Sequence, residues 1–337
     1  MDRILLGHGS GGRLMHQLIR DHIVPRFGIK VLADSAVLEN PSAGGKRLAF
    51  TTDSYVVSPI FFPGGNIGDL AVNGTVNDLA MVGATPLCLS AAFIIEEGFP
   101  VESLKRILVS MAEAAGRAEV KIVTGDTKVV DKGKGDGIFI NTSGIGALHD
   151  DTRLGPEMIR PGDKVIISGE IGRHGAAVMA GRNGISFDPP VTSDTAALGG
   201  LVKVMLACDS GIRIMRDPTR GGVATTLKEI AVESGLPVLI KEDSLPVPGG
   251  VRGACEILGL DPLYIANEGI LLAIVPAVTA DALLGVMRSH EYGGLAEVIG
   301  EIGTADPGRK GMVLLRTTVG GTRIIDMLAG EQLPRIC

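Results

Sequence analysis

The chain has 337 residues, 48 of them glycine and only 3% aromatic, and its formal charge is −6. This length suffices for about two packed domains, and a hydrophobic content of 45% excludes a disordered chain. The acidic balance argues against nucleic acid as a partner, and Gly83 and Pro86 interrupt the longest uncharged run (79–95), which argues against a membrane helix. We therefore expect a soluble, cytoplasmic protein.

Apolar residues in the first half alternate between helical and strand spacing. The expected elements are, in chain order, a helix at 14–23, strands at 48–52 and 55–57, a helix at 68–82, a strand at 87–95, a helix at 104–115, and strands at 120–123 and 138–148. The polar stretch 149–163 contains two Gly-Pro or Pro-Gly pairs and is typical of a linker.

The second half repeats this alternation, which indicates a mixed α/β protein. We expect strands at 165–168, 213–216 and 269–275, helices at 173–181, 195–208, 223–234 and 279–287, and two late strands. The predicted organisation is a Gly-rich N-terminal segment (1–40), two domains (41–150 and 151–323) and a C-terminal tail (324–337).

Four aspartates, each of which follows an apolar, strand-like stretch, are candidates for a metal site: Asp34, Asp53, Asp126 and Asp217. In α/β proteins, ligands collect beyond the carboxyl ends of strands. Carboxylates gathered there repel one another unless a hard cation such as Mg²⁺ neutralises them. The alternative is that these residues only cap turns and helices.

The helix at 68–82 carries a fifth candidate, Asp78, together with Asn73 and Asn77. Polar groups on such a small-residue helix are costly to bury without partners. Helical spacing directs Asp78 away from Asp69, so the two acids are not expected to hold one metal, and Asp69 is interpreted as a solvated residue.

The N-terminal loop contains Gly7, Gly9 and Gly12 in G-x-G-x-x-G spacing, the pattern of a dinucleotide-binding turn. The strand before it has only about four residues, and no regular βαβ unit follows. We therefore favour a loop in which the backbone amides of Gly9, Gly11 and Gly12 contact phosphates, with Arg13 adding positive charge.

A second segment of this kind, residues 217–223 (DPTRGGV), leads from a strand into a helix, so Arg220 and Gly221 are candidates for anion binding. Lys128 could contact a β- or γ-phosphate, although a lone lysine is usually a surface residue. Glu268, between an asparagine and a glycine, could be a general base or a turn residue.

Cys337 is the last residue of the sequence. Its α-carboxylate disfavours the thiolate, which argues against a spontaneously reactive nucleophile. A mobile arm whose thiol is loaded by a partner protein is the interpretation that we favour.

Several of these segments together resemble the aminoimidazole-ribonucleotide synthetase superfamily: 51–54 (TTDS), 68–78 (GDLAVNGTVND), 124–128 (TGDTK), 217–222 (DPTRGG) and 267–269 (NEG). The opening GHGSGGR and the terminal PRIC are similar to its hydrogenase-maturation carbamoyl dehydratases. The resemblance implies a two-domain α/β (α+β) fold, whose N-terminal domains pair across a homodimer into a β-barrel beside ATP, and a flexible tail. Selenophosphate synthetases of the superfamily carry a reactive Cys or selenocysteine and a Lys in the N-terminal loop, where this chain has Ser10 and Arg13.

The resemblance also implies ATP and Mg²⁺ as ligands. It assigns Asp34, Asp53, Asp78 and Asp217 to Mg²⁺, and Asp126 and Lys128 to the vicinity of the phosphates. The other nucleotide-binding candidates are Gly9, Gly11, Gly12, Arg13, Asn73, Thr127, Arg220 and Gly221.

The implied reaction begins with carbamoylation of Cys337 by a HypF-like carbamoyltransferase. ATP then drives dehydration of the S-carbamoyl group to a thiocyanate, and the cyano group passes to iron on a HypC–HypD complex. Glu268 is the expected proton acceptor, with Asp126 as the alternative. Two other functions remain open, a small-molecule kinase similar to thiamine-phosphate kinase and a nucleotide-binding scaffold without turnover.

Overall fold

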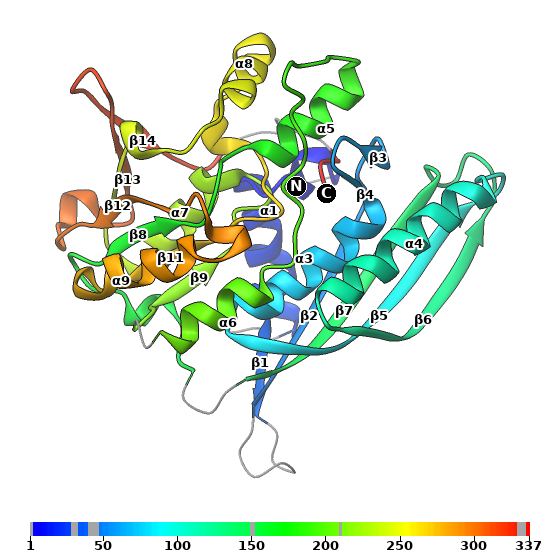
Figure 1. Ribbon diagram of the computed structural model, residues 1–337, viewed down its shortest axis with the longest axis horizontal. Coiled ribbons are helices and arrows are strands. Elements are labelled where there is room, and N and C mark those ends of the chain that lie inside the picture. The colour runs from blue at the N-terminus through cyan, green and yellow to red at the C-terminus, as the bar shows by residue number, and fades with distance from the viewer. Residues whose placement is uncertain (1–2, 28–32, 40–46, 149–151, 209–210, 329–334) are drawn as a thin grey trace.

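The computed structural model describes residues 3–27, 33–39, 47–148, 152–208, 211–328 and 335–337, which fold into two sheet-based units (Figure 1). The N-terminal unit is built on a five-stranded sheet of order β1-β2-β7-β5-β6. Its strands are β1 (Ala36–Glu39), β2 (Arg47–Tyr55), β5 (Ala84–Glu96), β6 (Lys121–Val130) and β7 (Ile138–Leu148). All neighbours are antiparallel except β5 and β6.

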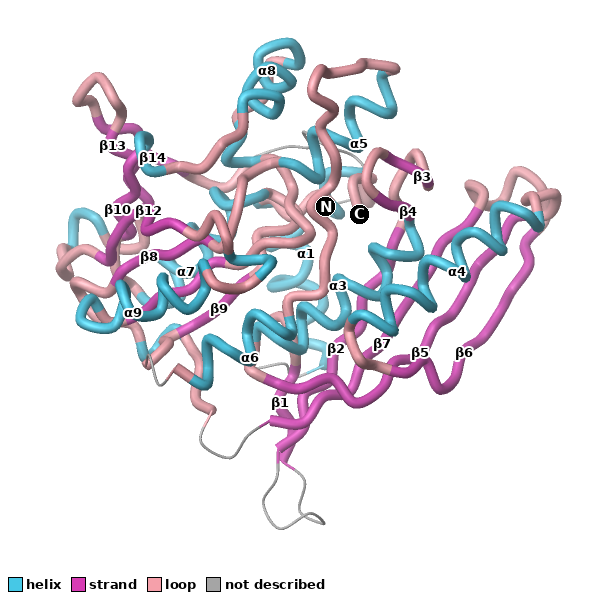
Figure 2. The backbone as a smooth tube through the Cα atoms, viewed as in Figure 1, coloured by secondary structure: helices cyan, strands magenta, loops and turns pink. Residues whose placement is uncertain are grey.

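Helices α3 (Ile67–Met81) and α4 (Val101–Arg117) lie across one face of this sheet (Figure 2). Along β7 the buried side chains alternate, so that Ile138 and Ile140 face the helices. α3 is rich in small residues and is buried almost throughout. Gly74 permits its close approach to β2, since a Cβ there would lie 2.3 Å from the Tyr55 hydroxyl. A two-stranded ribbon, β3 (Phe61–Phe62) and β4 (Gly65–Asn66), precedes α3.

The C-terminal unit is built on a seven-stranded sheet of order β14-β13-β10-β12-β8-β11-β9. Its strands are β8 (Lys164–Ile167), β9 (Ile214–Arg216), β10 (Val238–Lys241), β11 (Leu272–Val275), β12 (Glu297–Ile302), β13 (Val313–Arg316) and β14 (Thr322–Ile325). Both faces of β8 are covered, because Val165 and Ile167 pack with α7 (Gly222–Ser234), whereas Ile166 packs with α6 (Gly199–Ala207) and α9 (Ala277–Arg288).

Two further helices, α5 (Arg173–Asn183) and α8 (Gly249–Leu258), lie beyond the sheet. The remaining helical pieces are short: η1 (Leu6–Gly9), η4 (Pro156–Met158), η5 (Glu242–Ser244), η6 (Pro262–Tyr264), η7 (Glu291–Gly293) and η8 (Pro307–Arg309). None of the described helices is long and apolar enough to cross a bilayer.

The N-terminal segment forms one irregular helix from α1 (Arg13–Leu18), η2 (Ile19–Ile23) and α2 (Val24–Phe27). It begins against the C-terminal unit, where the Arg13 amide donates to the Leu328 carbonyl at 3.0 Å. Gly12 allows this approach, since a Cβ there would lie 2.6 Å from that oxygen.

The structure corrects several sequence-based expectations. Asp53 and Asp126 lie inside β2 and β6 rather than at strand ends, because both strands continue through polar residues. Three late strands form instead of two, and β10 and α8 were not expected. Ile324 lies in β14, so the sheet extends into the predicted tail. Val31 and Leu32 of the strand expected before Asp34, as well as tail residues 329–334, lie outside the described residues, and Ala33 is not in a strand.

Candidate active site

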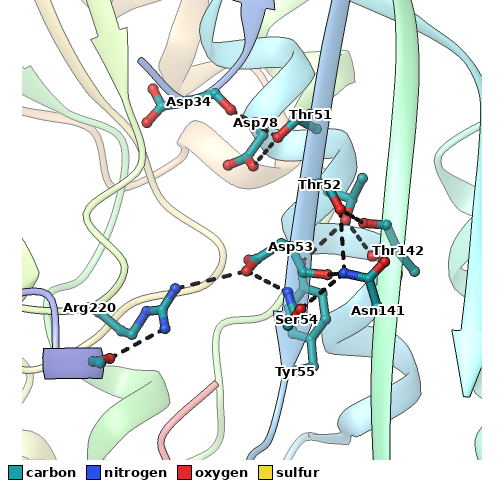
Figure 3. Close-up of polar contacts among 12 residues, drawn as sticks. Asp34, Thr51, Thr52, Asp53, Ser54, Tyr55, Asp78, Asn141, Thr142 and Arg220 are labelled. Atoms are coloured by element: carbon teal, nitrogen blue, oxygen red, sulfur yellow. Dashed lines mark hydrogen bonds and ion pairs between the residues drawn. The ribbon is translucent and has the colours of Figure 1, made fainter. Parts of the chain in front are cut away.

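Three carboxylates from distant parts of the chain converge between the two units. Asp34 precedes β1, Asp78 lies in the last turn of α3, and Asp217 directly follows β9. One oxygen from each lies within 4.8 Å of the others. Thr51 on β2 links two of them, since its hydroxyl lies 2.8 Å from Asp78 Oδ2 and 2.9 Å from the Asp34 carbonyl oxygen (Figure 3).

Burial and mutual repulsion act on this aspartate cluster (Asp34, Asp78 and Asp217). Burial raises the pKa of Asp217 to about 7, with a further contribution from Asp34. Burial also raises the pKa of Asp78 well above its usual value, and Asp217 and Asp34 add to the effect. A divalent cation held by oxygen ligands would remove this repulsion, so the donor set fits Mg²⁺.

Asp53 and Arg220 flank the cluster. Asp53 points from the helix-covered face of β2 towards Arg220, with 3.8 Å between Oδ1 and the guanidinium Nη2 (Figure 3). Arg220 also donates to the Gly9 carbonyl at 3.4 Å. A Cβ at Gly11 would lie 2.8 Å from the Arg220 carbonyl oxygen. The two Gly-rich segments predicted from sequence are therefore in contact.

Arg13, by contrast, does not turn towards the aspartate cluster. Its guanidinium lies 3.6 Å from Asp326, and both side chains are about half exposed. Gly221 has a positive φ of 80° at the N-terminus of α7, a conformation that favours glycine.

The end of the tail is docked rather than free in this structure. Cys337 and Ile336 are 6% and 3% exposed, and the Val56 amide donates to the Cys337 carbonyl oxygen at 3.1 Å. Burial raises the pKa of the Cys337 thiol to about 12, although the positive charge of Arg220 acts in the opposite direction. The thiol is therefore protonated at neutral pH, and the cause is burial rather than the α-carboxylate that the sequence argument used.

Glu268 lies close enough to Cys337 and Arg220 to affect both electrostatically. Its side chain is buried, and Oε1 has no hydrogen-bond partner among the described residues. Burial raises its pKa well above the usual value, and Asp217 and Asp53 contribute. Such a carboxylate is a strong base once it is ionised.

The turn that carries Glu268 is held by Asp194, a residue that the sequence analysis missed because nothing around it marks it. The Asp194 carboxylate accepts hydrogen bonds from the Glu268 amide (3.2 Å) and the Gly269 amide (3.1 Å). A Cβ at Gly269 would lie 1.6 Å from the Asp194 carbonyl oxygen, so only glycine fits there.

Both asparagines of α3 contact the segment that follows Asp194. Asn77 donates to the Ala196 carbonyl at 2.9 Å and accepts from the Leu198 amide at 2.8 Å. Asn73 donates to the Thr195 hydroxyl at 3.2 Å, while its buried Oδ1 has no partner among the described residues. Asp69 is not the solvated residue that we expected: its side chain is 15% exposed, accepts from the Asn66 amide at 3.0 Å and pairs with Arg117 at 3.6 Å.

The structure of one chain does not bring Asp126, Thr127 and Lys128 to the cluster. Strand pairing places Ala92 of β5 opposite Asp126 and Ile94 opposite Lys128, on the uncovered face of the sheet. β7 and β5 also separate β6 from β2. Asp126 and Lys128 are more than half exposed and pair with each other at 2.9 Å.

Comparison with known proteins identifies the family of the chain. Residues 32–148 match the model of the AIR synthase related protein N-terminal domain, and residues 160–310 match that of the C-terminal domain. The chain belongs to the AIR synthase related family. This confirms the superfamily and the two-domain α/β fold expected from the sequence motifs.

Within the AIR synthase related family, the chain is similar to proteins of hydrogenase maturation. "Carbamoyl dehydratase HypE" from Cupriavidus necator is 52% identical over 338 residues, covering 99% of this chain and 95% of the relative. A crystal structure of HypE in complex with ATP is 47% identical with a TM-score of 0.83, covering 99% of this chain and 100% of that one.

A HypE–HypF complex contains a chain that is 49% identical with a TM-score of 0.85, covering 92% of this chain and 99% of that one. The thiamine monophosphate kinase of Aquifex aeolicus is only 19% identical with a TM-score of 0.66, over 94% of this chain and 99% of that one. The latter likeness shows the fold alone.

Proposed function

We propose that this chain is an ATP-dependent carbamoyl dehydratase whose substrate is an S-carbamoyl group on its own Cys337. The observation that carries the proposal is the position of Cys337, which is buried within electrostatic reach of Arg220, Glu268 and Asp217. The relatives named carbamoyl dehydratase HypE, with about half of all residues identical along the whole chain, support the same activity.

In this reaction ATP is a substrate that converts the carboxamide oxygen into a leaving group. Transfer of the γ-phosphoryl group to that oxygen, with loss of one N–H proton, gives an iminophosphate and ADP. Expulsion of phosphate with loss of the second N–H proton then leaves the thiocyanate. The chain's own part is to orient the tail, to bind the phosphates and to accept a proton, for which Glu268 is the proposed base and Asp126 the alternative.

The proposed ligand roles follow the geometry of the site. Asp34, Asp78 and Asp217, with Asp53 beside them, would hold Mg²⁺, which offsets negative charge on the phosphates when bound. The two Gly-rich segments around Gly11 would contact the phosphates through backbone amides; their candidates are Gly9, Gly11, Gly12, Arg220 and Gly221. Asn73 would contact the nucleotide through Oδ1, which has no hydrogen-bond partner among the described residues. Arg13 is a weaker candidate because it pairs with Asp326.

A homodimer would give Asp126, Thr127 and Lys128 a role that one chain does not give them. Phe50, Ile94 and Ile145 are each about two-fifths exposed on the uncovered face of the five-stranded sheet. We propose that this face pairs with that of a second chain as a β-barrel, and that the pairing brings β6 of one chain to the phosphates held by the other.

The proposed partners are a HypF-like carbamoyltransferase, which would load Cys337, and a HypC–HypD complex, which would receive the cyano group on iron. A complex of HypE with HypF supports the first of these. An ATP-consuming reaction also fits the cytoplasmic location expected from the sequence.

The experiment that tests the function is mass spectrometry of the C-terminal peptide. The protein is incubated with the carbamoyltransferase and its substrates, first without and then with Mg-ATP. A carbamoyl adduct on Cys337 should form first and become a cyano adduct only with ATP. Cys337→Ala should still bind Mg-ATP but form neither adduct. ATP binding without conversion would favour the scaffold, and phosphorylation of thiamine monophosphate would favour the kinase.

A further inference from the structure

His174, near the beginning of α5, contacts the docked tail directly. The imidazole is fully buried, with Nε2 2.8 Å from the Ile336 carbonyl oxygen and Nδ1 2.8 Å from the Ser193 hydroxyl. The Phe62 ring packs against it at a right angle, with 5.3 Å between ring centroids. We propose that His174 is a positioning residue that holds the Ile336 carbonyl and thereby places the Cys337 thiol beside Arg220 and Glu268.

The hydrogen bonds around His174 have only one consistent direction. The Ile336 carbonyl can only accept, so Nε2 carries the proton and Nδ1 of the neutral ring must accept. The Ser193 hydroxyl therefore donates to Nδ1, and its oxygen accepts from the Thr195 amide at 3.1 Å. Burial lowers the pKa of His174 to about 4, so the ring is neutral at neutral pH. Ser193 thus selects the tautomer that binds the tail.

The tail also pairs with the backbone of residues 56–58. The Ser58 amide donates to the Arg335 carbonyl at 3.1 Å, and Arg335 Nε donates to the Val56 carbonyl at 2.9 Å. Arg182 of α5 donates to the Arg335 carbonyl at 2.9 Å. Among these contacts, His174 supplies the side chain that binds the residue directly before Cys337.

The polar contact at His174 depends on the tail being docked. When Ile336 leaves, Nε2 loses its partner inside an otherwise enclosed position, and a buried donor without a partner is unfavourable. An apolar residue could fill the same space without this dependence. A histidine at this position therefore favours one tail conformation over others.

The segment that selects the tautomer also contacts the reacting groups. Thr195 accepts from Asn73, and Asp194 accepts from the Glu268 amide. The position of the Cys337 thiol and that of the proposed base are thus set by adjacent residues of one segment. The contact between His174 and the tail does not depend on the proposed function. Only its expected effect on dehydration rests on that function.

The contact between His174 and the tail should affect the two steps at Cys337, loading and dehydration, in opposite directions. Loading by a partner requires Cys337 to leave its buried position, whereas dehydration requires it beside Glu268. Weakening the His174 contact should therefore make the thiol easier to reach and slow the conversion of the carbamoyl adduct.

The test compares alkylation of Cys337 and Cys255 by iodoacetamide in the full-length protein, read by peptide mass spectrometry. Cys255 is the internal control, because it is also buried, at 3% exposed, with a pKa raised by burial to about 11. His174→Phe keeps a ring but removes both hydrogen bonds. We expect Cys337 to react about three to ten times faster than in the unaltered protein, the effect of one or two lost hydrogen bonds, and Cys255 to be unchanged.

Two further variants test the contact between His174 and the tail. Ser193→Ala, which removes the donor to Nδ1 and also the acceptor of the Thr195 amide but leaves the His174 ring in place, should shift the Cys337 rate in the same direction by less. Asn183→Ala, on the exposed end of α5, should change neither rate. An unchanged Cys337 rate in His174→Phe overturns the proposal, and if that variant does not fold, an unchanged rate in Ser193→Ala does so.

A second measurement follows single-turnover conversion of carbamoylated Cys337. His174→Phe should slow it by a similar factor while its Mg-ATP affinity stays the same, and unaltered conversion would contradict a positioning role. The alkylation assay needs neither ATP nor a partner protein. Its failure would therefore leave the proposed dehydratase activity standing, whereas failure of dehydration in the unaltered protein would leave the tail contact standing.

Discussion

Arg216 and Asp34 form a buried ion pair between the two units of the fold. The guanidinium Nε of Arg216, on β9 of the C-terminal sheet, lies 3.2 Å from Oδ1 of Asp34, which precedes β1 of the N-terminal sheet. The same guanidinium binds Glu229 of α7 at 2.7 Å. One arginine thus stabilises a proposed metal ligand and joins the units.

Replacing Arg216 should destabilise the protein strongly. Arg216→Met leaves Asp34 without its cation and Glu229 with only His16, 2.8 Å away. Breaking a buried pair in this way typically costs about 3–5 kcal/mol. Urea unfolding followed by circular dichroism measures the difference. Arg288→Met, which removes an exposed pair with Glu297, should stay within about 1 kcal/mol. Equal losses in both variants would show that the Arg216 network contributes no more than a surface pair.

Asp78→Asn should weaken Mg-dependent binding of ATP. Loss of even an outer-shell partner lowers metal affinity by roughly 10- to 100-fold, so a lost ligand should do at least as much. Titration calorimetry with and without Mg²⁺ gives the comparison. Asp69→Asn is the matched control, because it lies on the same helix but bonds the Asn66 amide. Unchanged affinity in Asp78→Asn would remove Asp78 from the proposed ligand set.

Gly269→Ala should disrupt the turn that carries Glu268. The added Cβ would overlap the Asp194 carbonyl oxygen, so we expect a loss of about 3 kcal/mol or more in unfolding free energy. The control is Gly253→Ala in α8, where a Cβ meets no atom within 4 Å. Alanine in a helix should stabilise by roughly 0.5–1 kcal/mol. Thermal melts should show a lower melting temperature for Gly269→Ala and a higher one for Gly253→Ala than for the unaltered protein.

His174 should make the protein less stable in mild acid. Its pKa is about 4 in the folded chain, against 6.5 for an unperturbed histidine, so the unfolded chain binds the proton first as pH falls. Stability attributable to this group is complete above pH 6.5 and is lost between pH 6.5 and about 4, on the order of 3 kcal/mol in total.

Urea midpoints at about pH 7 and about pH 5 test this point. The acid-dependent loss should be smaller in His174→Phe than in the unaltered protein. If both proteins lose the same stability over this interval, the histidine does not contribute to the pH dependence.

Ile94→Asp should prevent the proposed dimer. It places a charge on the uncovered sheet face, where a partner chain would exclude water. Light scattering during size-exclusion chromatography should show a dimer for the unaltered protein and a monomer for the variant. Val278→Asp, at a residue that is 92% exposed on α9, should remain dimeric. A monomeric unaltered protein would contradict the homodimer itself.

The sequence alone determined which segments form the main helices and strands, because periodic burial imposes its spacing on apolar residues. It also marked Asp34, Asp78 and Asp217 as candidate ligands, and each of the two Gly-rich segments as a candidate phosphate-binding loop. Its motifs were sufficient to recognise the superfamily. These are local properties, which the order of residue types expresses directly.

Only the tertiary structure decided which of these residues meet. Strand pairing places Asp53 on the covered face of the sheet and Asp126 on the open one, and a shift in register, invisible in either strand alone, would reverse such an assignment. Asp194 and His174 act through contacts with residues far away in the chain, so no local pattern identifies them. The docked position of Cys337 likewise results from hydrogen bonds to α5 and to residues 56–58, which follow β2, and these exist only after the chain has folded.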